Sequence, residues 1–198
     1  IIWDKKNNRG YCKLLIVNSG NANAHTGKEG LRAIDYYTNK ISKKYQCPQS
    51  QILVSSTGVI GEQLDYKKII KTYDLIDSKK SKDLLSAAKS IMTTDTYSKT
   101  TLKEIKIGGQ LVRIYGIAKG SGMICPNMGT MLAYIFIEAN ISNILLKKML
   151  HSHLDSSFNS ISVDGDTSTS DTFMLFLLGD KKEKKLLNKG HINKISST

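Results

Sequence analysis

The apolar stretches of this chain are short, and their length limits the structures that the chain can form. The longest uninterrupted run, Met131–Ile137, has seven residues, which is the length of a buried strand. A helix that spans a bilayer needs about 20 apolar residues, so no membrane-spanning segment is expected. Other segments carry apolar residues at every third or fourth position, which is typical of helices. The mixture predicts an α/β or α+β fold with at least one layered sheet.

The expected strands and helices follow one another without strict alternation. Expected strands cover 11–17, 51–55, 102–107, 111–117, a segment starting near Thr130, 160–163 and 172–178. Expected helices cover 28–46, 66–76, 82–92 and 141–154. The dipeptide Gly108-Gly109 separates two alternating runs and predicts a β-hairpin with a tight turn. The length of 198 residues fits one domain or slightly more.

The charge of the chain does not favour nucleic-acid binding. Its 29 basic and 17 acidic residues give a net charge of +12. Only three of the basic residues are arginine, the residue that base-reading sites favour. Lysines are scattered and become dense only in Lys181–Lys194, which we interpret as a solvated tail. No nucleic-acid partner is therefore expected.

The possible metal ligands have unsuitable spacings. His151 and His153 are two positions apart near a helix end and cannot share a helical face. The acidic segment Asp164–Asp171 lacks the glutamate that closes a calcium loop, so a hydrogen-bonded turn is expected there. The cysteines at positions 12, 47 and 125 are far apart and are expected to be reduced thiols of a cytoplasmic protein. We expect no metal.

Two glycine-containing segments follow strands. Asn18–Gly27 lacks the spacing of known phosphate-binding loops and is expected to form a sharp turn. Thr57-Gly58 lies where a strand ends, and neighbouring backbone N–H groups there could stabilise an oxyanion. Ordinary turns have the same pattern, so the residues alone leave both interpretations open.

A third glycine-rich segment, Lys119–Thr130, leads directly into the longest apolar run. Its Gly129-Thr130 junction is suited to self-cleavage, because glycine tolerates strained backbone while the threonine hydroxyl attacks the preceding carbonyl. Cleavage leaves Thr130 with an α-amine of pKa about 8 beside its hydroxyl. The alternative is an ordinary strand that begins with threonine.

Five motifs together resemble one family, the ornithine acetyltransferases, which are bifunctional glutamate N-acetyltransferases of arginine biosynthesis. The motifs occur in the family's order, at Val17–Ala24, Ser56–Gly61, Met92–Thr96, Lys119–Ile124 with Pro126–Leu132, and Val163–Thr169. The resemblance implies a layered α/β sandwich. It also implies autoproteolysis between Gly129 and Thr130, which would give an α-chain part, 1–129, and a β-chain part, 130–198.

The resemblance further implies the roles of individual residues. Thr130 would accept an acetyl group from N2-acetylornithine and pass it to glutamate. Thr57 and Gly58 match the family's oxyanion pair, and Thr93 and Lys119 match residues that contact substrate. Without the family, Thr93 would be interpreted as a polar residue that ends a helix and Lys119 as an exposed cation. No cofactor is implied, although acetyl-CoA is a possible second donor.

The resemblance covers only part of a family member. Family members are about twice as long, and the chain begins at Ile1 without a methionine or a signal-like segment, so we expect a partial chain. The family's α and β chains associate, which implies a heterotetramer. The alternatives are an inactive truncated member and an amide hydrolase that uses the same threonine nucleophile.

Overall fold

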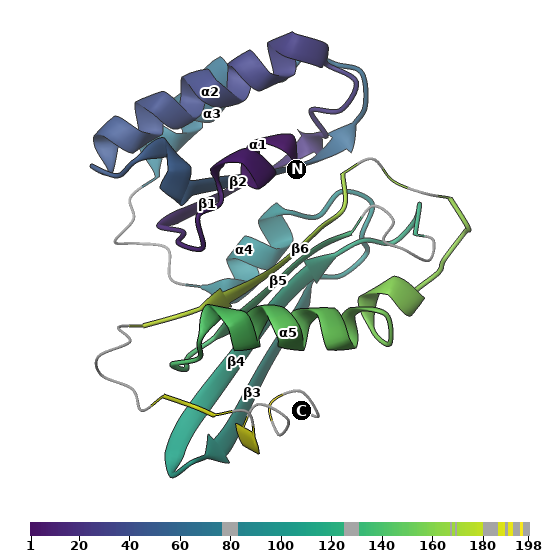
Figure 1. Cartoon of the computed structure of the whole chain (residues 1–198). Helices are drawn as coiled ribbons and strands as arrows, with labels where there is room; N and C mark the ends of the chain where they lie inside the picture. Colours follow the sequence, from purple (N-terminus) through teal and green to yellow (C-terminus); the bar gives the residue numbers. More distant parts are fainter. Residues whose placement is uncertain are drawn as a thin grey trace. The chain divides into compact units, whose positions relative to one another are not determined.

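The structure is a computed structural model that describes residues 1–76, 83–124, 131–166, 168, 170–179, 186–188, 190–191 and 195. The chain forms two compact units, Ile1–Thr93 and Thr94–Thr198, which we call unit 1 and unit 2 (Figure 1). Each unit contains a sheet and helices, which confirms the mixed α/β class. Among the described helices, none combines the length and apolarity that crossing a bilayer requires.

Unit 1 is built on two parallel strands joined through a helix. Its elements are α1 (Ile2–Asn7), β1 (Leu14–Asn21), α2 (Gly27–Lys44), the 3-10 turn η1 (Gln49–Gln51), β2 (Ile52–Val59), α3 (Tyr66–Leu75) and α4 (Leu84–Ser90). Strands β1 and β2 pair in parallel, in a register that begins at Leu14 opposite Ile52. Parallel neighbours need a crossover connection, and α2 supplies it.

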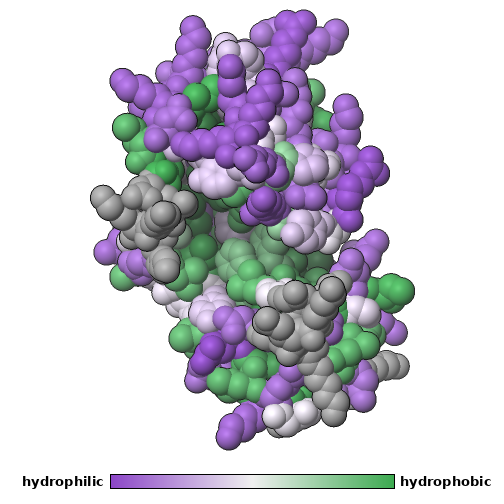
Figure 2. Space-filling view, turned by 90° about the vertical axis from the view of Figure 1, so that its left-hand side faces the viewer, coloured by the Kyte–Doolittle hydropathy of each residue, from purple (hydrophilic) through white to green (hydrophobic). Residues whose placement is uncertain are grey.

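The core of unit 1 lies between α2 and β2. The buried side chains of α2 recur at helical spacing, which places them on one face of the helix. They pack with β2 and the segments around it in one cluster: Ala33, Ile34, Tyr37, Ile41, Cys47, Ile52, Val54 and Leu64. Hydrophilic side chains cover much of unit 1, the upper part of Figure 2.

Helix α1 was not expected from the sequence, and it is tied to the backbone of β2. Trp3 Nε1 donates to the Ile52 carbonyl over 3.0 Å. The Val54 N–H donates to Asp4 Oδ1 over 2.9 Å. A six-residue helix has too few turns to show a helical pattern, and tertiary contacts of this kind stabilise it instead.

Unit 2 contains a four-stranded sheet in the order β3-β4-β5-β6. Its elements are β3 (Lys99–Ile107), β4 (Gln110–Lys119), β5 (Leu132–Ile137), α5 (Asn143–Leu154), the 3-10 turn η2 (Phe158–Ser160) and β6 (Thr172–Leu177). The predicted hairpin is confirmed: β3 and β4 are antiparallel, and Gly108 and Gly109 form the turn with positive φ. Strands β5 and β6 are parallel, and α5 lies in the connection between them.

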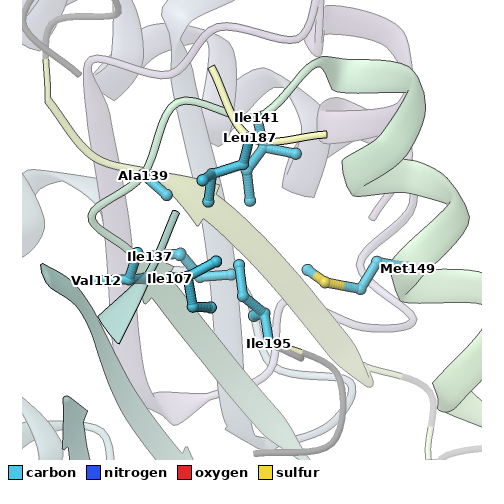
Figure 3. Close-up of a cluster of buried hydrophobic side chains, with 8 residues drawn as sticks. All are labelled: Ile107, Val112, Ile137, Ala139, Ile141, Met149, Leu187 and Ile195. Carbon is cyan, nitrogen blue, oxygen red and sulfur yellow. The ribbon is translucent and has the colours of Figure 1, made fainter. Parts of the chain in front are cut away.

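The core of unit 2 is formed by the sheet, α5 and segments near the end of the chain. Figure 3 shows its buried side chains, with Met149 extending from α5. The cluster comprises Ile107, Val112, Ile137, Ala139, Ile141, Met149, Leu187 and Ile195. The expected solvated tail over Lys181–Lys194 is wrong at Leu187, whose side chain is 1% exposed.

Two further expectations about elements need correction. The strand expected over 160–163 is absent. Ile161 and Val163 are exposed, and the Val163 N–H and the Ser162 hydroxyl both donate to the Ile124 carbonyl instead of forming a strand ladder. Strand β1 extends to Asn21, so the first part of the segment expected to be a turn belongs to a strand. The division at Gly129 and Thr130 into two chains stays a prediction.

Candidate active site

Thr57 and Gly58 lie near the end of β2, where its pairing with β1 becomes irregular. Asn21 is opposite both Thr57 and Val59, so two positions of one strand face a single residue of the other, as in a β-bulge. Bulges change the direction of local side chains and are common next to active sites. Thr57 is 2% exposed, and Gly58 has a φ of +131°.

The segment Asn18–Gly27 holds this end of β2 in place. The Ser56 hydroxyl donates to Asn18 Oδ1 over 2.6 Å, and Asn18 Nδ2 donates to the Asn21 carbonyl over 2.9 Å. Beyond the strands, the Gly61 N–H donates to the Ala24 carbonyl over 2.9 Å. The expected turn is confirmed beyond Asn21, and the asparagine side chains of this segment hydrogen-bond to backbone carbonyls.

Lys119 ends β4 in unit 2, and its side chain is buried. It is 1% exposed, so the alternative of an exposed cation is wrong. Burial lowers the pKa of the Lys119 ammonium, while the carboxylates of Asp95 and Asp171 act in the opposite direction. Lys119 pairs with Leu132, which is the first residue of β5 and follows Thr130 by two positions.

Asp95 joins the end of β4 to the segment that precedes β3. Its side chain is 1% exposed. Its Oδ1 accepts hydrogen bonds from Lys99 Nζ over 2.6 Å and from the Gly120 N–H over 2.7 Å. A buried carboxylate needs partners of this kind. Asp95 therefore fixes the backbone directly after Lys119.

The Asp164 carboxylate binds backbone groups of the glycine-rich segment that follows Lys119. Its carboxylate accepts from the N–H groups of Met123 and Ile124, over 2.6 Å and 3.1 Å. It also accepts from the Asp166 N–H over 3.3 Å, which confirms the expected hydrogen-bonded turn. These bonds, first that from Met123, hold the pKa of Asp164 below its usual value.

Asp171 binds the backbone on the C-terminal side of the predicted cleavage position. Its Oδ1 accepts from the Met131 N–H over 2.8 Å, and burial raises its pKa. Sequence reasoning missed the roles of Asp95 and Asp171. Asp95 lies inside the motif Met92–Thr96 and Asp171 ends the acidic segment Asp164–Asp171, but neither pattern indicates which backbone group the carboxylate binds.

The remaining predicted residues are less informative. Thr93 is exposed and lies three positions after the end of α4, which agrees with a polar residue near a helix end. Gly129 and Thr130 lie outside the described residues. Cys12 and Cys47 are free thiols. Within the described part of the chain, no three His, Cys, Asp or Glu side chains are arranged to hold a metal.

Comparison with known proteins identifies the family. The sequence model of the ArgJ family matches residues 1–195 of the chain. The chain belongs to the ArgJ family. Arginine biosynthesis bifunctional protein ArgJ of Rhizobium meliloti is 45% identical over 171 residues, and that of Bradyrhizobium diazoefficiens is 46% identical over 176 residues. These matches cover 86% and 88% of this chain, but 41% and 42% of the relatives.

The chain therefore spans about two-fifths of the length of these curated ArgJ relatives. It also resembles the crystal structure of arginine biosynthesis bifunctional protein ArgJ from Bacillus halodurans. The TM-score is 0.53 at 38% identity, and the match covers 58% of this chain and 61% of that one. The family predicted from the five motifs is confirmed.

Proposed function

We propose that the chain carries the self-processing nucleophile of a glutamate N-acetyltransferase of arginine biosynthesis. The family match over residues 1–195 supports this role. The structural observation that carries the proposal is the pairing of Lys119 with Leu132. This pairing brings a buried ammonium to the strand that starts two residues after Thr130. A lysine in this place suits substrates that carry an α-carboxylate.

Self-cleavage is the first step of the proposal. The Thr130 hydroxyl attacks the carbonyl carbon of Gly129, and the peptide bond to the Thr130 nitrogen breaks as an ester forms. Water hydrolyses the ester, leaving a carboxylate on Gly129 and an α-amine on Thr130. The two products, 1–129 and 130–198, stay associated, and the whole protein forms a heterotetramer.

Acetyl transfer follows at the same hydroxyl. Thr130 Oγ attacks the acetyl carbonyl of N2-acetylornithine, and ornithine leaves with the proton that the Thr130 α-amine took from the hydroxyl. The amine of glutamate then attacks the acetyl ester, which restores Thr130 and releases N-acetylglutamate. Thr57 and Gly58 donate to the oxyanion of each tetrahedral intermediate, where one donor is typically worth about 3 kcal/mol. Thr93 and Lys119 bind the substrates.

This chemistry needs no metal or organic cofactor, because the acetyl group is carried by Thr130 itself. In a bifunctional enzyme acetyl-CoA serves as a second acetyl donor and is therefore a substrate. An amide hydrolase would release the acetyl group to water instead. Competition between glutamate and water during single-turnover deacylation separates the two reactions.

The intact mass of the purified chain tests the proposal. We expect the 22.0 kDa chain to appear as two fragments that meet between Gly129 and Thr130. The Thr130→Ala variant should stay uncut and inactive in acetyl transfer. A wild-type chain that folds but is never cut, or an active Thr130→Ala variant, would overturn the proposal.

A further inference from the structure

The backbone that follows Thr130 is fixed at both of its polar groups. The Met131 N–H donates to Asp171 Oδ1 over 2.8 Å. The Met131 carbonyl accepts from the Thr172 N–H over 2.9 Å. Met131 is 6% exposed, so water has little access to take the place of either partner. Two consecutive residues at the start of β6 therefore hold Met131.

Asp171 is itself well supported. The Ser168 side chain hydrogen-bonds to its carboxylate, and the positive charge of Lys119 acts on it. Thr172, the next residue, is 9% exposed and pairs with Leu132 in the parallel ladder between β6 and β5. Asp171 thus directly precedes β6, the edge strand that pairs with β5 in the unit 2 sheet. A residue attached to a strand is held more precisely than one on a loop.

We propose that Asp171 is a positioning residue for Thr130, acting through the amide of Met131. This inference rests on the proposed function, in which Thr130 is the nucleophile. The Met131 nitrogen is bonded to the carbonyl carbon of Thr130, and the peptide group between them is planar. The hydrogen bond from the Met131 N–H to Asp171 therefore restrains the peptide bond through which Met131 is joined to Thr130.

The same bond matters more after cleavage. Thr130 then becomes the first residue of a new chain, and chain ends are usually poorly ordered unless they are tied down. Asp171 binds the new chain at Met131, the first residue whose backbone N–H still belongs to a peptide bond. Acyl transfer needs the reacting atoms within about 3–3.5 Å of each other, and a displacement of 1 Å can cost about a hundredfold in rate.

The test compares the rate of self-cleavage in three variants by time-resolved intact mass. Asp171→Ala removes the acceptor, and we expect cleavage to slow by at least about tenfold. Asp171→Asn keeps a carbonyl oxygen that accepts from Met131, so its rate should stay close to that of the wild type. Asp155→Ala removes an exposed carboxylate at the C-cap of α5 and serves as the matched control.

The outcomes separate this inference from the proposed function. An Asp171→Ala chain that is cut at the wild-type rate overturns the inference and leaves the proposed function intact. A folded wild-type chain that is never cut overturns both. If Asp171→Ala does not fold, Ser168→Ala decides, because it keeps Asp171 and removes a hydrogen bond to its carboxylate, together with the acceptor of the Ser170 N–H. Slower cleavage in that variant supports the inference, and an unchanged rate overturns it.

Discussion

A Cβ atom placed on Gly58 would lie 2.6 Å from the carbonyl oxygen of Gly20 on the neighbouring strand. Real Cβ atoms do not approach backbone so closely, and the φ of +131° at Gly58 is also unsuitable for other residues. The two glycines are partners in the β1–β2 register. They come from two different sequence motifs, Val17–Ala24 and Ser56–Gly61, which are therefore joined by one close backbone contact.

Gly58→Ala should destabilise the chain by about 2–4 kcal/mol, because strain at φ and the clash with Gly20 act together. Urea unfolding followed by circular dichroism measures the change. Gly61→Ala is the matched control, since Gly61 has a φ of +87° but open space around its Cβ position. The control should cost only about 1–2 kcal/mol. Equal losses in both variants would contradict the backbone clash.

Regular elements with a strong local signal were predictable from the sequence. The β3–β4 hairpin follows from Gly108-Gly109 between alternating runs, and α2 follows from apolar residues at helical spacing. Helix α1 was missed because six residues carry no clear period. The strand expected over 160–163 is wrong for the opposite reason: an alternating pattern is present, but no strand among the described residues pairs with it, and Ile161 and Val163 are exposed.

The candidate site was predictable in its residues but not in its contacts. The motifs identified Thr57, Gly58 and Lys119, yet nothing local indicates that the Lys119 side chain is buried. Its burial depends on neighbouring strands and on Asp95, which lies 24 positions away along the chain. The acidic turn was expected, whereas its bonds to Met123 and Ile124 depend on the tertiary fold.

The ion pair between the buried Asp95 carboxylate and Lys99, whose side chain is 30% exposed, should matter more than a pair in which both groups are exposed. Asp95→Ala leaves the Gly120 N–H and the Lys99 ammonium without this partner, and we expect a loss of about 3 kcal/mol in the free energy of unfolding. Asp74→Ala breaks the exposed pair with Lys44, which spans 3.3 Å, and should cost under about 1 kcal/mol. Urea unfolding measures both. Similar losses would show that Asp95 is not an important anchor.

The burial of Lys119 should make stability depend on pH in alkaline solution. Its pKa in the folded chain lies below 10.5, so just under that pH the unfolded chain binds more protons than the folded one. The contribution of Lys119 to stability therefore rises as pH increases toward 10.5. Urea unfolding between neutral pH and this value should show wild type gaining relative to Lys119→Met.

Lys148→Met, which removes an exposed lysine of α5, is the control for the loss of one positive charge. Its difference from wild type should stay nearly constant over the same range. A Lys119→Met difference that is equally constant, or that moves in the other direction, would show that the ammonium is well solvated.

Asp164 should also make stability rise with pH, but in acid, because the folded chain favours its charged form. Its pKa lies below 3.8 because the Met123 N–H and other backbone groups bond to its charged form. Its contribution to stability is complete above 3.8 and is lost as pH falls through the lower folded value. The stability difference between wild type and Asp164→Asn should therefore shrink in acid, which unfolding curves at a series of pH values measure. Asp155→Asn is the control for the lost charge. A wild-type advantage that persists at the lowest pH would mean that the Asp164 bonds do not require its charge.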